Sequence, residues 1–289
     1  MELLKKIFSP VGKTVDYIQN HFKAMLFLLL LLVLFYPSQK EHLKPNNLQS
    51  VELLGPIFDT AETVRALDEA RENDSIKGVL LIVDSPGGAV APSLEVAYAV
   101  KRLREKKPVV AYAKGVLASG SYYASIWANE IIANPGAMVG SIGVIMEGVN
   151  LEGLMRKVGI ETQVVKAGKY KQVGTPDRPW KPYEKAEIDK VIRATYDMFV
   201  HDVAEARGLD VNDSGRFADA HIFTAAQAKV VGLVDTLGVE YDARKKVEKL
   251  SGVKEPQWNE ESEFERFLHS IGAEGAAMLH LYFPQRSLR

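Results

Sequence analysis

The most restrictive feature of this 289-residue sequence is a continuous aliphatic run from Gly78 to Asp84, GVLLIVD. A strand with one face in water alternates apolar and polar residues, whereas this run has no polar position between Val79 and Val83. Such runs are typical of parallel strands that helices bury on both faces. The run therefore predicts a central strand of an α/β fold.

Short β-rich runs and helical patterns alternate around this strand. We expect strands over 51–58, 78–84, 109–113 and 131–133, and helices over 61–71, 92–106 and 119–130. Repeated strand-helix alternation requires crossover connections, which join parallel strands. The pattern therefore predicts a largely parallel sheet.

The second half of the chain continues the mixed pattern. Apolar runs predict strands over 142–147 and 162–165 around a helix over 151–158, followed by a long helix over 184–207. The apolar stripe of the long helix comprises Ile188, Val191, Ile192, Thr195, Met198 and Phe199, which we expect on its inner face. No internal repeat divides the chain, so we expect one α/β domain.

An uncharged segment from Ala24 to Tyr36, AMLFLLLLLVLFY, interrupts the otherwise mixed composition. As a helix it would be about 20 Å long, so spanning the ~30 Å hydrocarbon core would require its flanking residues and snorkelling of Lys23 and Lys40. Its length also suits the core of a cleaved signal peptide, but no A-x-A-like cleavage site follows. We expect an uncleaved signal anchor.

Charge on either side of this segment predicts its orientation. The preceding residues contain four lysines and two acids, so the positive-inside rule places the N-terminus in the cytoplasm. The expected organisation is a cytoplasmic segment over 1–23, a transmembrane signal anchor over 24–37, a linker over 38–47, a folded domain over 48–255 outside the cytoplasm and a C-terminal tail over 256–289.

Composition excludes several functional classes. The formal net charge is −1, which lacks the basic excess of a nucleic-acid-binding protein. The chain has no cysteine, which excludes disulfides, thiolate metal sites and a cysteine nucleophile. We expect neither a cofactor nor a metal.

A second motif, GVLASGSYYAS over 115–125, places Ser119 where a strand is expected to end and a helix to begin. No histidine lies between it and the lysine-containing segment KAGKYKQVGTP over 166–176, which favours a Ser-Lys dyad. A second hydroxyl, on Ser121, would point to another face of a helix that begins at Ser119. Lys166, Lys169 and Lys171 are all candidate bases, and the pattern alone does not choose among them.

Two glycines follow the buried strand directly, in the sequence Asp84-Ser85-Pro86-Gly87-Gly88. Glycines at the carboxyl end of a strand allow backbone N–H groups to face a ligand, as an oxyanion hole requires. An ordinary turn is the alternative. We expect Asp84 to cap or brace this turn.

Five segments occur in one order: GVLLIVDSPGG, GVLASGSYYAS, VGSIGV, VVKAGKYKQVGTPDRP and HIFTAAQAKVVGLVD. Over roughly residues 51–252 the chain thereby resembles the signal peptide peptidase A family of serine proteases, in its short membrane-anchored form. The resemblance implies a Clp protease/crotonase-like β-α-β superhelix and assembly into a homo-oligomeric ring, with an octamer expected. It also implies that residues 48–255 are a peptidase domain.

The same resemblance assigns the site residues. It implies that Ser119 is the nucleophile, that Lys171, at the end of a G-x-x-K spacing, is the general base, and that Ser141 orients this lysine. It further implies an oxyanion hole formed by Gly87 or Gly88 with Gly120. Ser121 stands where the family usually has glycine, and Gln172 stands where it frequently has an acid.

The base must be a neutral lysine, although at pH 7 only about one free lysine in 2,500 is neutral. Burial away from acids lowers a lysine pKa, and a serine hydroxyl can bind either protonation state. The implied function is a membrane-anchored serine endopeptidase of the bacterial inner membrane. Its periplasmic domain would degrade cleaved signal peptides and other small unfolded peptides, with each dyad completed between neighbouring protomers.

Two alternatives have a different chemistry. A crotonase-like acyl-CoA enzyme would use the same fold without a covalent serine, and a noncatalytic ring scaffold would carry a vestigial dyad. We expect Tyr122, Tyr123 and Trp127 in the core or in subunit contacts, with the substrate groove as the alternative. Thr224 of the HIFTAAQA element is expected to cap a helix, next to a structural His221.

Overall fold

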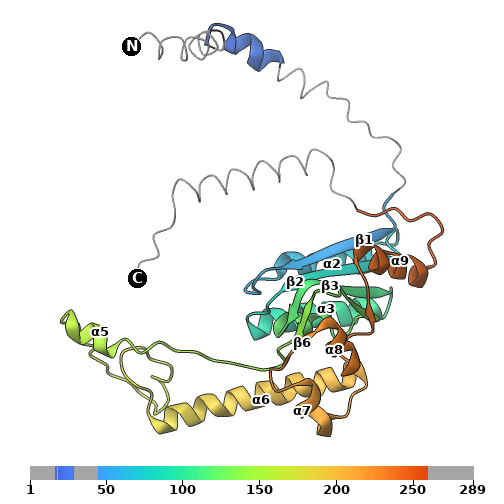
Figure 1. Ribbon diagram of the computed structural model, residues 1–289. Helices are drawn as coiled ribbons and strands as arrows, with labels where there is room; N and C mark the ends of the chain where they lie inside the picture. Colours follow the sequence, from blue (N-terminus) through green and yellow to red (C-terminus); the bar gives the residue numbers. More distant parts are fainter. Residues whose placement is uncertain (1–16, 18, 29–44, 260–289) are drawn as a thin grey trace, which may run out of the picture. The chain divides into compact units, whose positions relative to one another are not determined.

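The computed structural model describes residues 17, 19–28 and 45–259 (Figure 1). Residues 17 and 19–28 are helical, and within the described part of the chain no helix is long and apolar enough to cross a membrane. Most of the anchor expected over 24–37 and of the linker expected over 38–47 lies outside the described residues. The same holds for the tail beyond Asn259.

The central sheet contains five parallel strands in the order β1-β2-β3-β4-β7. Their bounds are Leu48–Leu54, Gly78–Ser85, Val109–Ala118, Glu130–Ala133 and Thr236–Leu237. β2 lies between β1 and β3, and the side chains of Val79 to Val83 are all buried. This confirms the prediction of a parallel sheet with a central strand buried on both faces.

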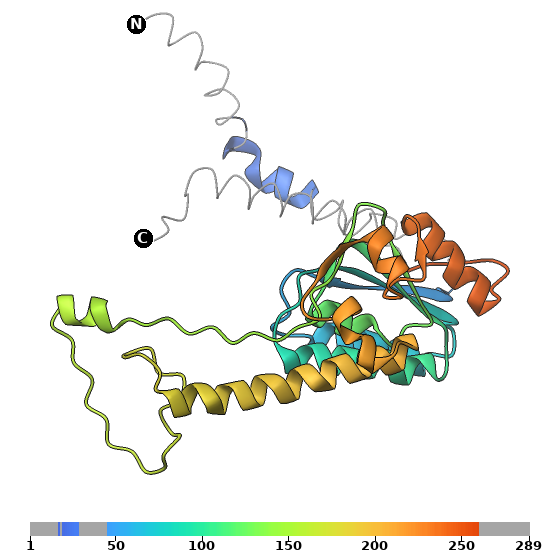
Figure 2. The ribbon, with the colours of Figure 1, turned by 60° about the horizontal axis from the view of Figure 1, so that its bottom comes forward.

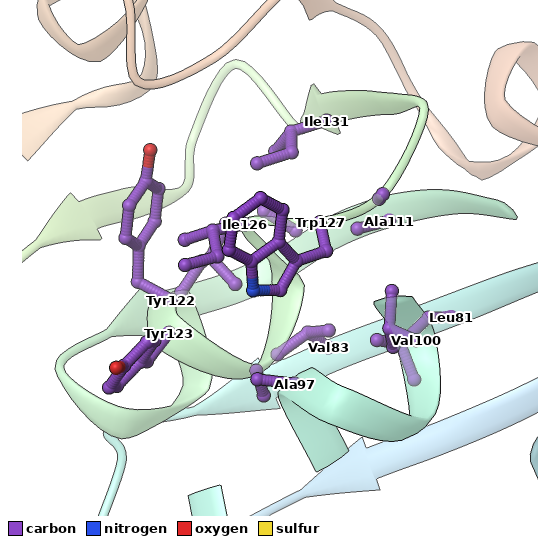
Figure 3. Close-up of a cluster of buried hydrophobic side chains, with 14 of the residues drawn as sticks. Leu81, Val83, Ala97, Val100, Ala111, Tyr122, Tyr123, Ile126, Trp127 and Ile131 are labelled. Atoms are coloured by element: carbon purple, nitrogen blue, oxygen red, sulfur yellow. The ribbon is translucent and has the colours of Figure 1, made fainter. Parts of the chain in front are cut away.

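Three helices form the crossovers of this sheet, namely α2 (Ala61–Glu72), α3 (Val90–Arg104) and α4 (Gly120–Ser125). They pack on one face around a core that includes Tyr122, Tyr123 and Trp127, as predicted for these aromatics (Figure 3). α9 (Glu240–Ser251) covers the opposite face, where Ala243 and Val247 pack on β2 and β3.

α4 is much shorter than the helix expected over 119–130. The chain leaves the helix after Ser125 because it is drawn back to β3: the backbone N–H of Asn129 donates to the Val109 carbonyl at 2.8 Å, and the Val109 N–H donates to Asn129 Oδ1 at 2.8 Å. The site therefore follows a strand, a tight turn and a helix of less than two turns.

Two short strands extend the carboxyl-terminal half of β3. β5 (Met138–Gly140) pairs with β3 in parallel, and β6 (Ile222–Thr224) pairs with β5 antiparallel. Between α6 (Pro182–Arg207) and β6 lie the 3-10 helix η1 (Val211–Asp213) and α7 (Ser214–Phe217), and α8 (Ala225–Val230) follows β6. Thr224 accepts from the Gln227 N–H at 3.3 Å at the start of α8, so the predicted cap is confirmed.

Residues 145–181, which we call the arm, extend away from the sheet (Figures 1 and 2). The arm contains α5 (Glu152–Lys157), but the strands predicted over 142–147 and 162–165 do not form. Strands require neighbours that complete their backbone hydrogen bonds, and no sheet edge reaches this segment. Val165 is consequently fully exposed.

α6 (Pro182–Arg207) joins the arm to the folded body. Its carboxyl-terminal half packs into the core through Phe199, Val200, Val203 and Ala204. The expected inner face does not hold along the whole helix, because Val191 is 57% exposed. The amino-terminal half of α6 extends from the folded body to the arm, and its stripe residues Ile188 and Ile192 are only partly buried.

Candidate active site

The turn after β2 brings Gly87 and Gly88 against the turn that follows β3. Gly87 has a φ of 89°, and a Cβ on it would lie 2.6 Å from the Gly120 nitrogen and 2.8 Å from the Ser119 Cβ. Only glycine permits this approach. Asp84 was predicted to cap or brace the Ser85–Gly88 turn; its Oδ1 instead accepts from the Val116 N–H at 2.9 Å and so ties β2 to β3 ahead of the two turns.

The N–H of Gly88 faces the same space. The backbone groups on either side of it are bonded to Ile57: the Ile57 N–H donates to the Gly87 carbonyl at 2.9 Å, and the Ala89 N–H donates to the Ile57 carbonyl at 2.7 Å. Among the described residues neither the Gly88 N–H nor the Gly120 N–H has an acceptor, whereas the Gly87 N–H donates to Ser85 Oγ at 3.2 Å. The available donors are therefore Gly88 and Gly120.

Ser119 lies on a strained strand-to-helix turn. Its φ of 54° and ψ of −124° are rarely adopted by residues with a side chain. Its N–H donates to the Gly140 carbonyl at 2.8 Å, and its carbonyl accepts from the Tyr123 N–H at 3.0 Å. This geometry resembles the sharp turn that exposes a nucleophilic serine in hydrolases.

Ser121 has a different environment from Ser119. It is fully buried, and its Oγ donates to the Ser85 carbonyl at 2.6 Å and accepts from the Ala118 N–H at 2.9 Å. These bonds tie the end of β2 to the end of β3. Ser121 therefore acts as a structural hydroxyl in this arrangement, and Ser119 is the hydroxyl beside the pocket.

A small pocket of about 80 Å³ opens at Ser119. Its polar lining includes Gly88, Ser93, Ser119, Gly120 and Thr195, and its apolar lining includes Val90, Tyr123, Val144, Ile145 and Phe199. Sequence patterns had not indicated Val90 and Ser93 as part of a site. Thr195 and Phe199 were visible only as part of the apolar stripe of α6.

Tyr123 joins α4 to α6 beside this pocket. Its ring stacks on Phe199 with centroids 4.5 Å apart, and its hydroxyl donates to Asp202. Burial, together with the Asp202 carboxylate, raises the pKa of Tyr123 above its ordinary value. The neutral tyrosine thus holds α6 against α4. Tyr123 also lines the pocket, which is the position that the alternative prediction of a substrate-groove residue requires.

Ser141 lies next to Ser119 through the strand β5. Gly140 accepts from the Ser119 N–H, and the following residue, Ser141, has a φ of 50° and donates its own N–H to His221 at 2.7 Å. Ser119, Ser141, Gly87, Gly88 and Gly120 are thus brought together. His221 contributes its backbone carbonyl, which fits the structural role expected for it.

The candidate lysines are all on the arm, away from this cluster. Lys171 is exposed, and the ring of the preceding residue, Tyr170, packs against Tyr183 at 5.8 Å between centroids. Tyr183 and the pocket residue Thr195 are separated by twelve residues of α6, which is about 18 Å. A single chain therefore does not bring Lys171 to Ser119.

The other two lysines are used within the arm. Lys166 Nζ donates to the Lys169 carbonyl at 3.3 Å, and Lys169 Nζ lies 5.2 Å from the Tyr170 ring and 5.1 Å from the Tyr183 ring. Lys171 has no such contact among the described residues. Across the same residues, no group of three or more His, Asp or Glu side chains is arranged to hold a metal ion.

The model of the family described as peptidase family S49 matches residues 101–254, which include Ser119, Ser141 and Lys171. Relatives named "putative protease" occur in Methanocaldococcus jannaschii, 46% identical over 199 residues (69% of this chain, 64% of the relative), and in Synechocystis, 40% identical over 204 residues (70% and 74%). The "Serine protease SPPA, chloroplastic" of Arabidopsis thaliana is 32% identical over 185 residues, covering 64% of this chain and 27% of that protein.

Among solved structures, the chain is similar to the 1510-N membrane-bound stomatin-specific protease, solved as two single-residue mutants. One matches with a TM-score of 0.51 and 15% identity, covering 75% of this chain and 99% of that one. The other, in complex with a substrate peptide, matches with a TM-score of 0.51 and 16% identity, covering 79% and 98%. At this identity the likeness establishes the mixed α/β fold alone.

Proposed function

Because the chain belongs to peptidase family S49, a family of serine endopeptidases, we propose that it hydrolyses peptide bonds with Ser119 as the nucleophile and Lys171 as the general base. The observation that carries this proposal is the strained turn at Ser119, which faces a pocket together with the N–H groups of Gly88 and Gly120, neither of which has an acceptor in the part of the chain that the structure describes. Within the α/β fold, we assign the chain to the Clp protease/crotonase type of β-α-β superhelix.

In the proposed reaction the Ser119 Oγ attacks the substrate carbonyl while its proton passes to a neutral lysine amine. The negative charge on the carbonyl oxygen is stabilised by the N–H groups of Gly88 and Gly120. The lysine ammonium then protonates the leaving amine, and water hydrolyses the acyl-enzyme by the reverse proton route. The Ser141 hydroxyl would bind the lysine amine in either protonation state.

The base would come from a neighbouring copy of the chain. In one chain the ring of Tyr170, the residue before Lys171, packs on Tyr183, which lies about 18 Å along α6 from Thr195 in the pocket wall, so the arm of one protomer must reach the Ser119 of the next. This arrangement supports a closed ring, for which we propose an octamer. Burial of the amine against the neighbour would favour the neutral form that a general base requires.

The proposed substrates are cleaved signal peptides and other small unfolded peptides. The pocket is small, and its apolar lining includes Val90, Val144 and Phe199, so it suits a single apolar side chain of an extended peptide and excludes a folded protein. The apolar segment over 24–37 would anchor the ring in the bacterial inner membrane with the N-terminus in the cytoplasm. The catalytic domain would then be periplasmic.

A fluorophosphonate probe tests the nucleophile. We expect labelling of the wild type at Ser119, none in Ser119→Ala, and retained labelling in the folded fraction of Ser121→Ala, the control that removes the neighbouring hydroxyl. Turnover of a leucine-rich peptide by Ser119→Ala should fall at least about 10³-fold. Wild-type turnover by Ser119→Ala in the native assembly would refute the assignment.

Mixing two inactive variants tests the base and the assembly. Lys171→Arg should be as inactive as Lys171→Ala, because a guanidinium does not deprotonate. Rings that contain both Ser119→Ala and Lys171→Ala subunits should recover part of the activity, since some neighbouring pairs then hold an intact serine and an intact lysine. Zero activity in demonstrably mixed rings at every ratio would exclude an intersubunit dyad.

A further inference from the structure

A buried ion pair lies where the arm joins the start of α6, remote from the pocket. Arg178 donates from Nη2 to Glu184 Oε1 at 2.7 Å and from Nη1 to Oε2 at 2.8 Å. The Glu184 side chain is 0% exposed and that of Arg178 is 23% exposed. Among the described residues Glu184 is the one charged residue that is buried, although the arm around it is largely exposed.

The pair joins the start of α6 to the loop that carries Lys171. Glu184 Oε2 also accepts from the Lys181 N–H at 2.7 Å, which caps the first turn of the helix. On the other side, Arg178 Nη2 donates to Gln172 Oε1 at 3.3 Å. Gln172 directly follows Lys171, so Arg178 bridges the helix terminus and the residue beside the proposed base.

Burying a charge is costly unless a partner and hydrogen bonds compensate, and such pairs contribute more to a defined geometry than to net stability. The planar guanidinium donates two parallel hydrogen bonds to the carboxylate, which restricts their relative orientation. The pair therefore defines the position of the Lys171 loop on the start of α6. α6 continues from this point to Thr195 and Phe199 in the pocket wall. The Lys171 loop is therefore fixed to the start of the same helix whose later residues form part of the pocket wall.

We propose that Arg178 and Glu184 are positioning residues for catalysis, which hold the Lys171 loop at a fixed point on α6 so that the lysine amine reaches Ser119 of the neighbouring copy. This inference rests on the proposed function. Because misplacing a catalytic group by about 1 Å can cost about 100-fold in rate, a loosened loop should lower kcat while substrate binding is maintained.

The decisive variant is Arg178→Lys in the full-length assembled protein. Lysine keeps the charge but loses the bidentate contact and the reach to Gln172. We expect kcat at pH 7 to fall at least about tenfold, with KM within about twofold of the wild type. We also expect the rising limb of the pH–rate profile to move to higher pH, because a loosened lysine is more hydrated.

A role in stability alone predicts a different profile. Fewer assembled molecules would lower the rate by the same factor at every pH, with the limb unmoved. The charged and titratable groups on the loop and at the start of α6 near Lys171 are Lys166, Lys169, Tyr170, Asp177, Arg178, Lys181, Tyr183, Glu184 and Lys185. Arg178→Lys changes no formal charge among them, so a shift of the limb reports the position of the lysine.

Arg193→Lys is the matched control. Arg193 forms an exposed pair with Asp189 at 2.7 Å on the same helix, and its substitution should leave kcat and the pH profile unchanged. If Arg178→Lys does not assemble, Gln172→Ala, which leaves the ion pair intact, decides instead. A loss of about three- to tenfold in kcat with the limb moved supports the proposal.

The inference is overturned if Arg178→Lys has the wild-type kcat and the wild-type rising limb of the pH–rate profile. It is also overturned if kcat falls by the same factor at every pH. When Gln172→Ala is the deciding variant, unchanged kinetics overturn it. These results are separable from failure of the proposed function. That failure would appear in the parent protein, as no probe label on Ser119 or as full turnover by Lys171→Ala.

Discussion

The strain at Ser119 predicts that Ser119→Gly is more stable than Ser119→Ala. A residue with a side chain at a φ of 54° and a ψ of −124° costs about 1–3 kcal/mol, which glycine avoids. Glycine loses about 0.5–1 kcal/mol more than alanine in chain entropy on folding. The central difference is about 1 kcal/mol in favour of glycine, between extremes of about 0 and 2.5 kcal/mol, which corresponds to roughly 2–4 °C in Tm for a domain of this size.

The measurement is the Tm of the two variants under identical conditions, and both should be inactive. Ser214, the first residue of α7, provides the matched control, because its φ of −54° and ψ of −30° are ordinary helical values. There the order should reverse, with Ser214→Ala more stable than Ser214→Gly by about 0.5–1 kcal/mol. If Ser119→Ala equals or exceeds Ser119→Gly in Tm, the turn does not store the strain that we assign to it.

Three further predictions follow from the contacts at the site and in the arm. Ser121→Ala should lower the free energy of unfolding by about 1–3 kcal/mol, because the buried Ser85 carbonyl loses its donor; an unchanged denaturation midpoint would contradict this. Gly120→Ala should abolish probe labelling because its Cβ would lie 2.2 Å from Ser93 Oγ, and adding Ser93→Ala should restore part of it; equal labelling with and without Ser93→Ala would refute the steric cause. The hydrogen bonds from Arg178 lower the pKa of Glu184 from 4.5 to about 2, so its stabilising contribution is complete above pH 4.5 and declines as the pH falls towards 2. Acid titration of unfolding should show a smaller loss over that window in Glu184→Gln than in the wild type.

Sequence patterns predicted the elements of the sheet well where the spacing of apolar residues along the chain indicates which side chains are buried. The run ending at Asp84 and the helix stripes on either side gave β2, α2 and α3 to within a few residues. The same reasoning failed over 142–147 and 162–165, since β-branched apolar residues form a strand only beside another strand. In this chain residues 145–147 and 162–165 belong to the arm, and no described strand pairs with them, whereas the Ile142 carbonyl accepts from the Ala220 N–H at 2.9 Å just before β6.

The candidate site divides in the same way. The run of small residues from Ala118 to Ser121 indicated the turn at Ser119, but the choice between Ser119 and Ser121 required the contact of Ser121 with the Ser85 carbonyl, 36 residues away. The apolar wall at Phe199 and the ion pair of Arg178 with Glu184 left no distinctive signal in the sequence. Both depend on where α6 lies.

The strand-helix alternation, the glycine-rich turns and the types of residue available for chemistry can all be read from the sequence, because they depend on neighbours along the chain. That the turn after β2 closes on the turn after β3, and that Gly88 and Gly120 line one pocket with N–H groups that have no acceptor among the described residues, is seen only in the folded structure. The same holds for the position of Lys171 on an arm away from Ser119. The physical reason is that these relations arise from packing between segments far apart in sequence, where close approach and burial select one arrangement among many that the local patterns allow.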